Sequence, residues 1–305
     1  MDAILSFGPR QTPDSNAVHS GAGLAERLER GELIAFTPCP FQMPSREERA
    51  FLFDQQLKLA KKNISFNPET NTASGFQPAS PDQGARLTQI LADFSRGASS
   101  WLASVLPEYA KAWRADRASY RPEEEATRRL RLTARNDLLH IDAFPSRPTR
   151  GWRILRLYVN INPTDPRVWV TSDTFADLLA TYGHMVGLPN MFNEGWAWRF
   201  GQGLLNIFQP GSGARTVYDR FMLRFHHFLK TNDQFQERSR KQFWHFAPGT
   251  AWLAFTDALS HADLRGRYAL EHSFFIAPEA LACPELAPAA LLERACGMPV
   301  HPRAA

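Results

Sequence analysis

The stretch from His140 to Trp169, HIDAFPSRPTRGWRILRLYVNINPTDPRVW, decides the fold class of this chain. It opens with a histidine and an aspartate two residues apart, crosses a loop rich in Pro and Arg, and enters a β-rich run that ends at Asn162-Pro163. Runs of branched and aromatic residues bounded by turn residues are typical of strands. Since side chains two residues apart on a strand share a face, we expect His140 and Asp142 to point the same way.

A second β-rich region runs from Pro248 to Ile276 and reads PGTAWLAFTDALSHADLRGRYALEHSFFI. One predicted strand ends at His261, and the next begins at Gly266 after a short turn. Strand alternation then predicts that Arg267 shares a face with the small residues that follow it, whereas Arg265 lies in the turn and points to solvent. Because the interval from His261 to Arg267 is short, Arg265 is an alternative to Arg267 as the arginine that pairs with a carboxylate.

The remaining sequence predicts helices around these two strand groups. Residues 1–23 are a flexible arm rich in Gly, Pro and Ser, and 24–120 form a mainly helical layer. Residues 121–280 form a β-barrel core with a helical insertion at about 173–237, and 281–305 are a tail. No repeat or clear linker divides the chain, so we expect a single domain spanning residues 1–305, of the α+β class.

Composition excludes several classes of protein. The chain has 305 residues, 44% hydrophobic and 22% charged, which is ordinary for a globular domain and excludes global disorder. No apolar stretch approaches the roughly 20 residues of a membrane span, and the N-terminus lacks the basic segment of a signal peptide, so we expect a cytoplasmic protein. The net charge of +4 is too small to indicate a nucleic-acid binder, and three cysteines without a CxxC pair indicate reduced thiols.

His140, Asp142 and His261 are the candidate metal ligands. Two histidines and one carboxylate on one side of a barrel form a facial triad, which holds Fe(II) and leaves coordination positions open. The alternative is a buried hydrogen bond between His140 and Asp142 with His261 as an unrelated surface residue. His226 and His227 are neighbours on a helical pattern and face about 100° apart, so they cannot both bind one ion, and we expect them to be structural.

The amino-acid sequence of the two β-rich segments resembles that of the Kdo 3-hydroxylases of lipopolysaccharide assembly, over about residues 128–278. The resemblance implies a double-stranded β-helix (jelly-roll, cupin-like) fold and an Fe(II)- and 2-oxoglutarate-dependent dioxygenase that hydroxylates C3 of a Kdo sugar on Kdo-lipid A or a precursor, forming Ko. It implies that His140, Asp142 and His261 bind the iron and that Arg267 pairs with the distal carboxylate of 2-oxoglutarate. Asn160, on the strand behind the metal ligands, is a further candidate for binding this co-substrate.

An arginine-rich segment surrounds the first candidate ligands. Residues 126–156 contain eight Arg, no Lys and only two acids, a local net charge of 8 − 2 = +6. Arg147, Arg150 and Arg153 follow the metal ligands where a loop at the barrel mouth is expected, and arginine pairs well with carboxylates and phosphates. We therefore expect them to bind the anionic sugar-lipid. The alternative is that each is a solvated surface residue.

Three lysines suggest a membrane contact. Ser45 and Glu48 form a capping-box pattern that opens a predicted helix reaching to about residue 62, and Lys58, Lys61 and Lys62 cluster at its end. A basic, amphipathic helix of this kind lies on membrane surfaces, which fits peripheral contact with the inner membrane. A core helix with a solvated basic end is the alternative.

Two other functions remain open at the level of sequence. One is a 2-oxoglutarate oxygenase that acts on another small molecule or on a protein side chain. The other is a non-catalytic β-barrel that binds anionic glycans through its arginines. Succinate formation distinguishes an enzyme from a binding protein.

Overall fold

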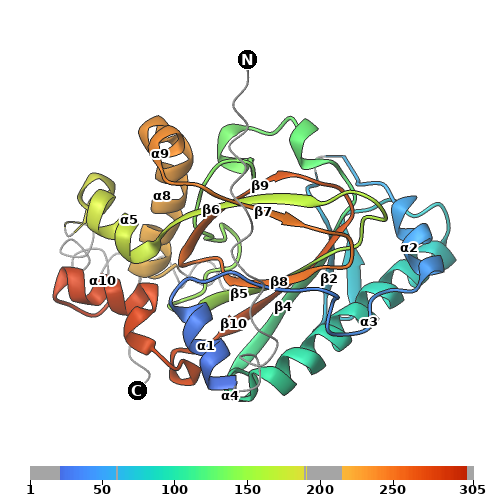
Figure 1. Ribbon diagram of the computed structural model, residues 1–305, viewed down its shortest axis with the longest axis horizontal. Coiled ribbons are helices and arrows are strands. Elements are labelled where there is room, and N and C mark those ends of the chain that lie inside the picture. The colour runs from blue at the N-terminus through green and yellow to red at the C-terminus, as the bar shows by residue number, and fades with distance from the viewer. Residues whose placement is uncertain (1–20, 60, 189, 191–214, 301–305) are drawn as a thin grey trace, which may run out of the picture.

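The computed structural model describes residues 21–59, 61–188, 190 and 215–300 (Figure 1). Most of the predicted N-terminal arm, the middle of the predicted helical insertion (189 and 191–214), residue 60 and the last five residues lie outside the described residues. The two β-rich regions recognised in the sequence both form strands, and these strands build two facing antiparallel sheets.

The larger sheet has seven strands and takes strands from both predicted β-rich regions. Its central pair is β5 (Arg153–Asn160) and β10 (Ala269–Ile276), which are antiparallel over their full length. In spatial order the sheet is β1 (Ile34–Phe36), β8 (Ala251–Phe255), β5, β10, β4 (Trp113–Arg121), β2 (Ile64–Asn67) and β3 (Thr72–Ser74).

The smaller sheet has three strands, in the order β7 (Gln242–Phe246), β6 (Arg167–Thr174) and β9 (Leu259–Arg265). A backbone bridge between His140 and His261 places the HxD segment beside β9, in the position of a fourth strand of this sheet. The smaller sheet, extended in this way, faces strands β8, β5, β10 and β4, which is the arrangement of a double-stranded β-helix. The predicted fold class is therefore confirmed.

Helices cover the barrel on two sides (Figure 1). α3 (Pro81–Val105) and α4 (Pro107–Lys111) lie under the larger sheet, where Leu87 and Leu91 join the same apolar core as Leu155 and Leu157 of β5. At one end of the barrel gather α5 (Phe175–Tyr182), α8 (Val217–Thr231), α9 (Asp233–Arg238) and α10 (Pro288–Cys296). α1 (Gly21–Glu29) and α2 (Arg46–Phe53) complete the N-terminal layer.

The expected boundary between helical and strand regions is wrong. β4 already begins at Trp113 and lies in the middle of the larger sheet, whereas residues 128–138 form no strand and contain the short helical turn Leu132–Ala134. The alternation in RRLRLTARN does not produce a strand, because its apolar residue Leu132 is exposed rather than packed in the core, while Arg128 pairs with Glu125.

The predicted helix from Ser45 begins as expected but ends early. The capping box is present, since the Ser45 backbone N–H donates to the Glu48 carboxylate at 2.7 Å and the Glu48 N–H donates to the Ser45 hydroxyl at 3.1 Å. α2 ends at Phe53, however, so the lysines after it do not lie on an amphipathic helix. That basis for membrane contact is wrong. No helix among the described residues is long and apolar enough to cross a membrane.

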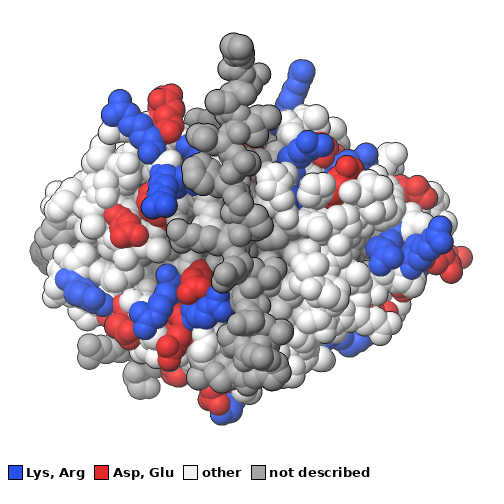
Figure 2. Space-filling view, in the orientation of Figure 1, with Lys and Arg blue, Asp and Glu red and all other residues white. Residues whose placement is uncertain are grey.

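Charges of both signs are interspersed on the surface. On the face seen in Figure 2, basic and acidic side chains lie close to one another rather than in areas of one sign. Four of the eight arginines in the arginine-rich segment pair with acids that lie outside this segment. Its members that form ion pairs are Arg128, Arg135, Arg147, Arg153 and Arg156.

Candidate metal centre

Backbone pairing brings the three predicted ligands together. The His140 N–H donates to the His261 carbonyl at 3.1 Å, and the His261 N–H donates back to the His140 carbonyl at 2.9 Å. Asp142 is tied to the larger sheet, because its N–H donates to the Thr256 carbonyl at 2.6 Å. The imidazole centroids of His140 and His261 are 4.7 Å apart, and His261 also stacks on Trp169 at 5.3 Å. The two strand groups therefore meet at this cluster.

Each histidine at the centre uses one ring nitrogen to contact a backbone carbonyl. The Nδ1 atom of His140 lies 2.7 Å from the Leu138 carbonyl, and that of His261 lies 3.0 Å from the Leu259 carbonyl. A carbonyl only accepts, so Nδ1 carries the proton and Nε2 keeps its lone pair. Burial lowers the pKa of both imidazoles, which keeps them neutral at pH 7. Neutral imidazoles oriented in this way are metal ligands.

Asp142 completes the donor set as a carboxylate. Its Oδ1 lies 3.6 Å from His140 Nε2, and its Oδ2 accepts from Arg156 Nη1 at 2.7 Å. Burial acts to raise the pKa of Asp142, but the Arg156 charge and the contact with His140 outweigh it and hold the pKa well below the usual range. The carboxylate is therefore ionised and held in place.

The structure adds His226, which sequence reasoning placed among the structural histidines. One ligand atom each from His140, Asp142 and His226 lie within 4.8 Å of one another. His226 Nδ1 contacts the Ile141 carbonyl at 2.6 Å, between the two HxD side chains. The argument that His226 and His227 cannot both bind one ion still holds, but it does not exclude His226 alone. A usable signal was its place on the buried stripe of α8, with Met222, Phe225 and Leu229.

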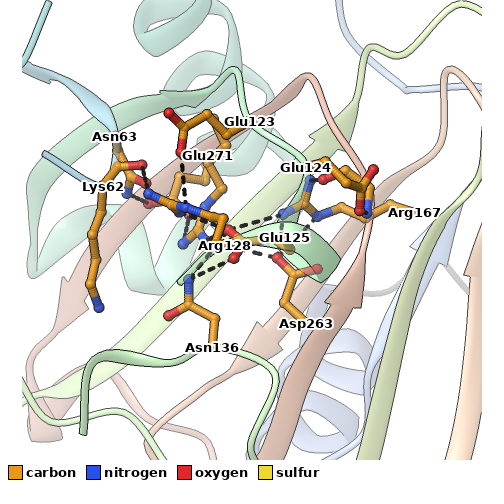
Figure 3. Close-up of polar contacts among 12 residues, drawn as sticks. Lys62, Asn63, Glu123, Glu124, Glu125, Arg128, Asn136, Arg167, Asp263 and Glu271 are labelled. Atoms are coloured by element: carbon orange, nitrogen blue, oxygen red, sulfur yellow. Dashed lines mark hydrogen bonds and ion pairs between the residues drawn. The ribbon is translucent and has the colours of Figure 1, made fainter. Parts of the chain in front are cut away.

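Beside the metal centre, the barrel interior holds a network of buried ion pairs (Figure 3). Glu271 of β10 lies 2.6 Å from Arg121 and 2.8 Å from Arg156, and Arg121 lies 3.1 Å from Glu125. Asp263, two residues after His261 on β9, pairs with Arg167. The network extends to Arg128 and Asn136, which contact Glu125. Paired charges of both signs therefore fill this part of the barrel.

Among the described residues, no hydrogen bond, ion pair or ring contact joins the predicted co-substrate residues Arg267 and Asn160 to the three predicted metal ligands. β10 begins only at Ala269, and Tyr268 has a left-handed φ of 58°, so the alternation that placed Arg267 on the inner face does not apply. The Arg267 side chain is exposed, donates to the Pro122 carbonyl at 3.2 Å and lies over the Tyr268 ring. Asn160 is fully buried, and its amide donates to the carbonyls of Asp165 and Phe246.

Two of the three predicted substrate arginines line a groove. The groove has a volume of about 460 Å³ and is bounded by Arg114, Arg117, Arg147, Arg150 and Trp152, among others. The segment 147–149 also lines a small pocket that reaches Asp142, so the groove adjoins the metal centre. The third predicted substrate arginine, Arg153, does not fit this role.

Arg153 is fully buried and pairs with Asp257 at 3.1 Å. It does not line the groove, because it begins β5 and its side chain packs over the Phe255 ring.

The donor set fits one divalent metal ion of the first transition row. Imidazole nitrogens suit iron, and two of them with one carboxylate leave coordination positions for further ligands. The outer contacts of the ligands are also present, because each imidazole has a carbonyl partner and Asp142 has Arg156. The cluster is therefore suited to a reaction in which the metal binds a chelating co-substrate.

The chain matches one family model and several solved structures. The family of 3-deoxy-D-manno-oct-2-ulosonic acid (Kdo) hydroxylases matches residues 11–299. A crystal structure of the Kdo hydroxylase KdoO, described as a non-heme Fe(II) α-ketoglutarate-dependent dioxygenase with α-ketoglutarate and Fe(III), is 31% identical with a TM-score of 0.79. That match covers 92% of this chain and 91% of the other.

Two further KdoO structures give the same picture. The cobalt(II) complex is 30% identical with a TM-score of 0.83, and the complex with succinate and Fe(III) is 29% identical with a TM-score of 0.81. Each match covers 98% of this chain and 97% of the other. No curated protein matches the sequence. Because the family model spans nearly the whole chain, this protein belongs to the Kdo hydroxylase family.

Proposed function

We propose that this chain is an Fe(II)- and 2-oxoglutarate-dependent dioxygenase that hydroxylates C3 of a Kdo sugar on Kdo-lipid A or a precursor, forming Ko. The observation that carries the proposal is the cluster of His140, Asp142 and His226, with His261 paired to His140 through its backbone, in a member of the Kdo hydroxylase family. When bound, iron with 2-oxoglutarate and dioxygen supplies the oxidising power for a C–H bond that no side chain can attack.

The protein residues contribute position and charge. His140, Asp142 and His261 are the proposed iron ligands. We favour His261 as the third ligand because two backbone hydrogen bonds connect it to His140, and the two imidazole centroids lie 4.7 Å apart. His226 then has the role of a positioning residue, since its Nδ1–H donates to the carbonyl between His140 and Asp142.

The partner of the co-substrate stays a prediction. Arg267 and Asn160 are the residues that the sequence indicated, yet Arg267 is exposed and the Asn160 amide already binds two carbonyls. Arg156 is the rival that the site favours, because it is buried next to Asp142 and its Nε has no hydrogen-bond partner among the described residues. A buried guanidinium with a free N–H is suited to a carboxylate.

Arg267→Ala and Arg265→Ala form a matched pair for this question. Both side chains are exposed, so we expect each variant to change the KM for 2-oxoglutarate by less than about twofold. Loss of one charge-assisted contact costs about 1.5–3 kcal/mol, which is roughly tenfold or more in KM. Succinate release measured without sugar gives the KM, and a tenfold rise for Arg267→Ala alone would restore its predicted role.

Arg147 and Arg150 are the proposed substrate-binding residues. They line the groove next to the pocket of Asp142, together with Arg114 and Arg117. The carboxylate of Kdo and the phosphates of its lipid anchor are ligands that arginine binds in a bidentate manner. The Trp152 ring in the same groove offers an apolar surface for a sugar.

Peripheral membrane contact and a cytoplasmic location stay predictions. The support that remains is the loop after α2, where the Leu59 side chain is 94% exposed near the exposed Lys58 and Lys61. An apolar side chain with adjacent basic residues suits an anionic membrane surface. Sedimentation with anionic vesicles tests this, and Leu59→Asp is expected to reduce the bound fraction.

The test of the proposed function is an oxygen-transfer assay. The enzyme is incubated with Fe(II), 2-oxoglutarate, dioxygen and a Kdo-lipid A precursor, and the product is examined for a mass gain of one oxygen atom on the Kdo unit. Succinate formation without that gain would indicate an oxygenase with another substrate. Binding of the glycolipid without succinate would indicate a non-catalytic glycan-binding protein.

A further inference from the structure

Two lysines with no salt bridge lie close to the metal centre. Lys230, in the last turn of α8, is 3% exposed, and its Nζ donates to the Thr133 carbonyl at 3.4 Å. Lys62, just before β2, is half-buried, and its Nζ donates to the neighbouring Ala134 carbonyl. Within the described part of the chain, neither ammonium forms an ion pair with a carboxylate. Both ammonium groups therefore contact one backbone turn, and among the described residues neither contacts a carboxylate.

This arrangement differs from that of every arginine in the adjacent network. Figure 3 shows Arg128 and Arg167 in contact with carboxylates, whereas no contact is drawn from the Lys62 ammonium to any of the acids there. A buried ammonium without a counter-charge is costly, and native proteins rarely keep one without a function. Burial, followed by the positive charge of Arg121, lowers the pKa of Lys62 to about 8. Burial, followed by the charge of Lys62, lowers the pKa of Lys230 to about 8 as well.

The two lysines lie close enough to the metal centre to interact electrostatically with its residues. Lys230 is four residues after His226 on α8, so both side chains lie on the same face of that helix. The Lys230 charge contributes to the lowered pKa of His140, and Asp142 is among the charges that act on both lysines. Both belong to segments outside the barrel strands, whereas Arg121, Arg156 and Arg167 project from strands.

We propose that Lys62 and Lys230 form a carboxylate-binding subsite beside the metal centre, and that it binds the carboxylate of the sugar substrate. The inference rests on the proposed function for the identity of the sugar. A 3-deoxy-2-ulosonic acid carries its carboxyl group at C1, two carbons from the C3 methylene. When C3 is presented to the metal, the carboxylate must therefore lie beside the metal centre. The same chemistry is found in the distal carboxylate of 2-oxoglutarate, and the experiment separates the two sources.

The experiment compares Lys62→Met and Lys230→Met with Lys241→Met. Lys241 is the matched control because its ammonium also donates only to backbone carbonyls, those of Gln236 and Glu237, but is exposed. With a water-soluble Kdo glycoside as substrate, we expect each test variant to raise the KM for sugar at least about tenfold, which corresponds to about 1.4 kcal/mol. Sugar binding to Co(II)-loaded enzyme, followed by calorimetry, should weaken to the same degree. Lys241→Met should change neither value.

A second kinetic measurement identifies the source of the carboxylate. The KM for 2-oxoglutarate, from succinate release without sugar, should stay within about twofold of the wild-type value. A tenfold rise in that KM with unchanged sugar binding would assign the lysines to the co-substrate and overturn the proposal. Unchanged sugar binding in both test variants would also overturn it. If the wild-type enzyme does not hydroxylate the glycoside, the proposed function fails instead.

Stability measurements separate a binding role from a structural one. Methionine removes an uncompensated buried charge and keeps the length of the side chain, so we expect the Tm of the metal-free Lys230→Met protein to be unchanged or higher. Lys230→Arg keeps the charge and should restore part of the sugar affinity. A lower Tm with unchanged KM for sugar would show that Lys230 is structural and would contradict the proposal.

Discussion

The buried arginines of the network and the two lysines near them, Lys62 and Lys230, differ in how their charges are compensated. Arg121 and Arg156 share Glu271, and Arg167 is held by Asp263, so these cations are compensated within the chain. Among the described residues, the ammonium groups of Lys62 and Lys230 donate only to the carbonyls of one turn. Because burial of a charge requires compensation, a paired cation is explained by the structure itself. A cation without a contacting carboxylate is not explained in this way, so we infer that a ligand supplies the negative charge. The metal centre, where a ligand would bind, lies close to both lysines.

The largest effect is expected at the metal centre, where both groups of cations meet. His261→Ala should abolish Co(II) binding and turnover, whereas His226→Ala should weaken Co(II) binding by about 10–100-fold, as for a residue that positions a ligand. Titration followed by cobalt absorption measures both affinities. Retained binding in His261→Ala with complete loss in His226→Ala would make His226 the third ligand and would falsify our assignment.

The arginine network should respond strongly in stability. Glu271→Ala leaves Arg121 and Arg156 buried without their shared carboxylate, so we expect a loss of roughly 3–5 kcal/mol in the free energy of unfolding. Urea denaturation of the metal-free protein measures it. Glu69→Ala is the control, since Glu69 is exposed at the rim of the groove and should have little effect. A loss below about 1 kcal/mol for Glu271→Ala would mean that the network is not needed for stability.

A fall in pH should destabilise the folded protein, because the native structure keeps two buried histidines neutral. Burial lowers the pKa of His272 to about 4 and that of His226 to about 3, both below the ordinary value of 6.5. Between these values and 6.5 the unfolded chain binds more protons than the native one, so stability is lost as the pH falls below about 6.5. His272→Gln can keep the contact with Ser95 and should remove on the order of 1–2 kcal/mol of this loss between pH 6.5 and 5.

Denaturation midpoints of the metal-free protein at pH 7.5, 6.5 and 5 test this dependence. The wild type should show the steeper decline, and the His272→Gln profile should be flatter. Identical slopes in the two proteins would indicate that His272 gains a proton in the native state as readily as in the unfolded chain.

The smallest effect is expected in the groove, where cations are partly solvated. Arg147→Gln with Arg150→Gln should raise the KM for the glycolipid by about tenfold and reduce its dependence on salt, because exposed charges are screened. Succinate release without sugar should continue at the wild-type rate. Unchanged glycolipid affinity would identify both arginines as solvated surface residues. The comparison with the lysine variants then shows which part of the substrate each cation contacts.

Local patterns predicted some features well. The HxD segment, the β-rich runs and the distal histidine were recognisable because hydrophobic alternation and turn residues are encoded locally. The capping box at Ser45 and the buried β5 strand are confirmed for the same reason. β4 was missed, since the charged residues in WRADRASYR obscure its alternation, and the paired arginines of residues 128–138 imitated a strand.

The sequence by itself determined the family and the β-helix core, and the two-residue spacing of His140 and Asp142 predicted that their side chains share a face. Only the tertiary structure decided which charges are compensated. Glu271 and Arg121 are 150 residues apart, Lys62 and Ala134 are 72 apart, and His226 reaches Ile141 across 85 residues. Ion pairs and buried charges depend on distances between segments remote in the chain, and no local pattern records those distances. For the same reason, the sequence did not predict that Arg267 is exposed or that Lys62 and Lys230 lie near the metal centre without a contacting carboxylate among the described residues.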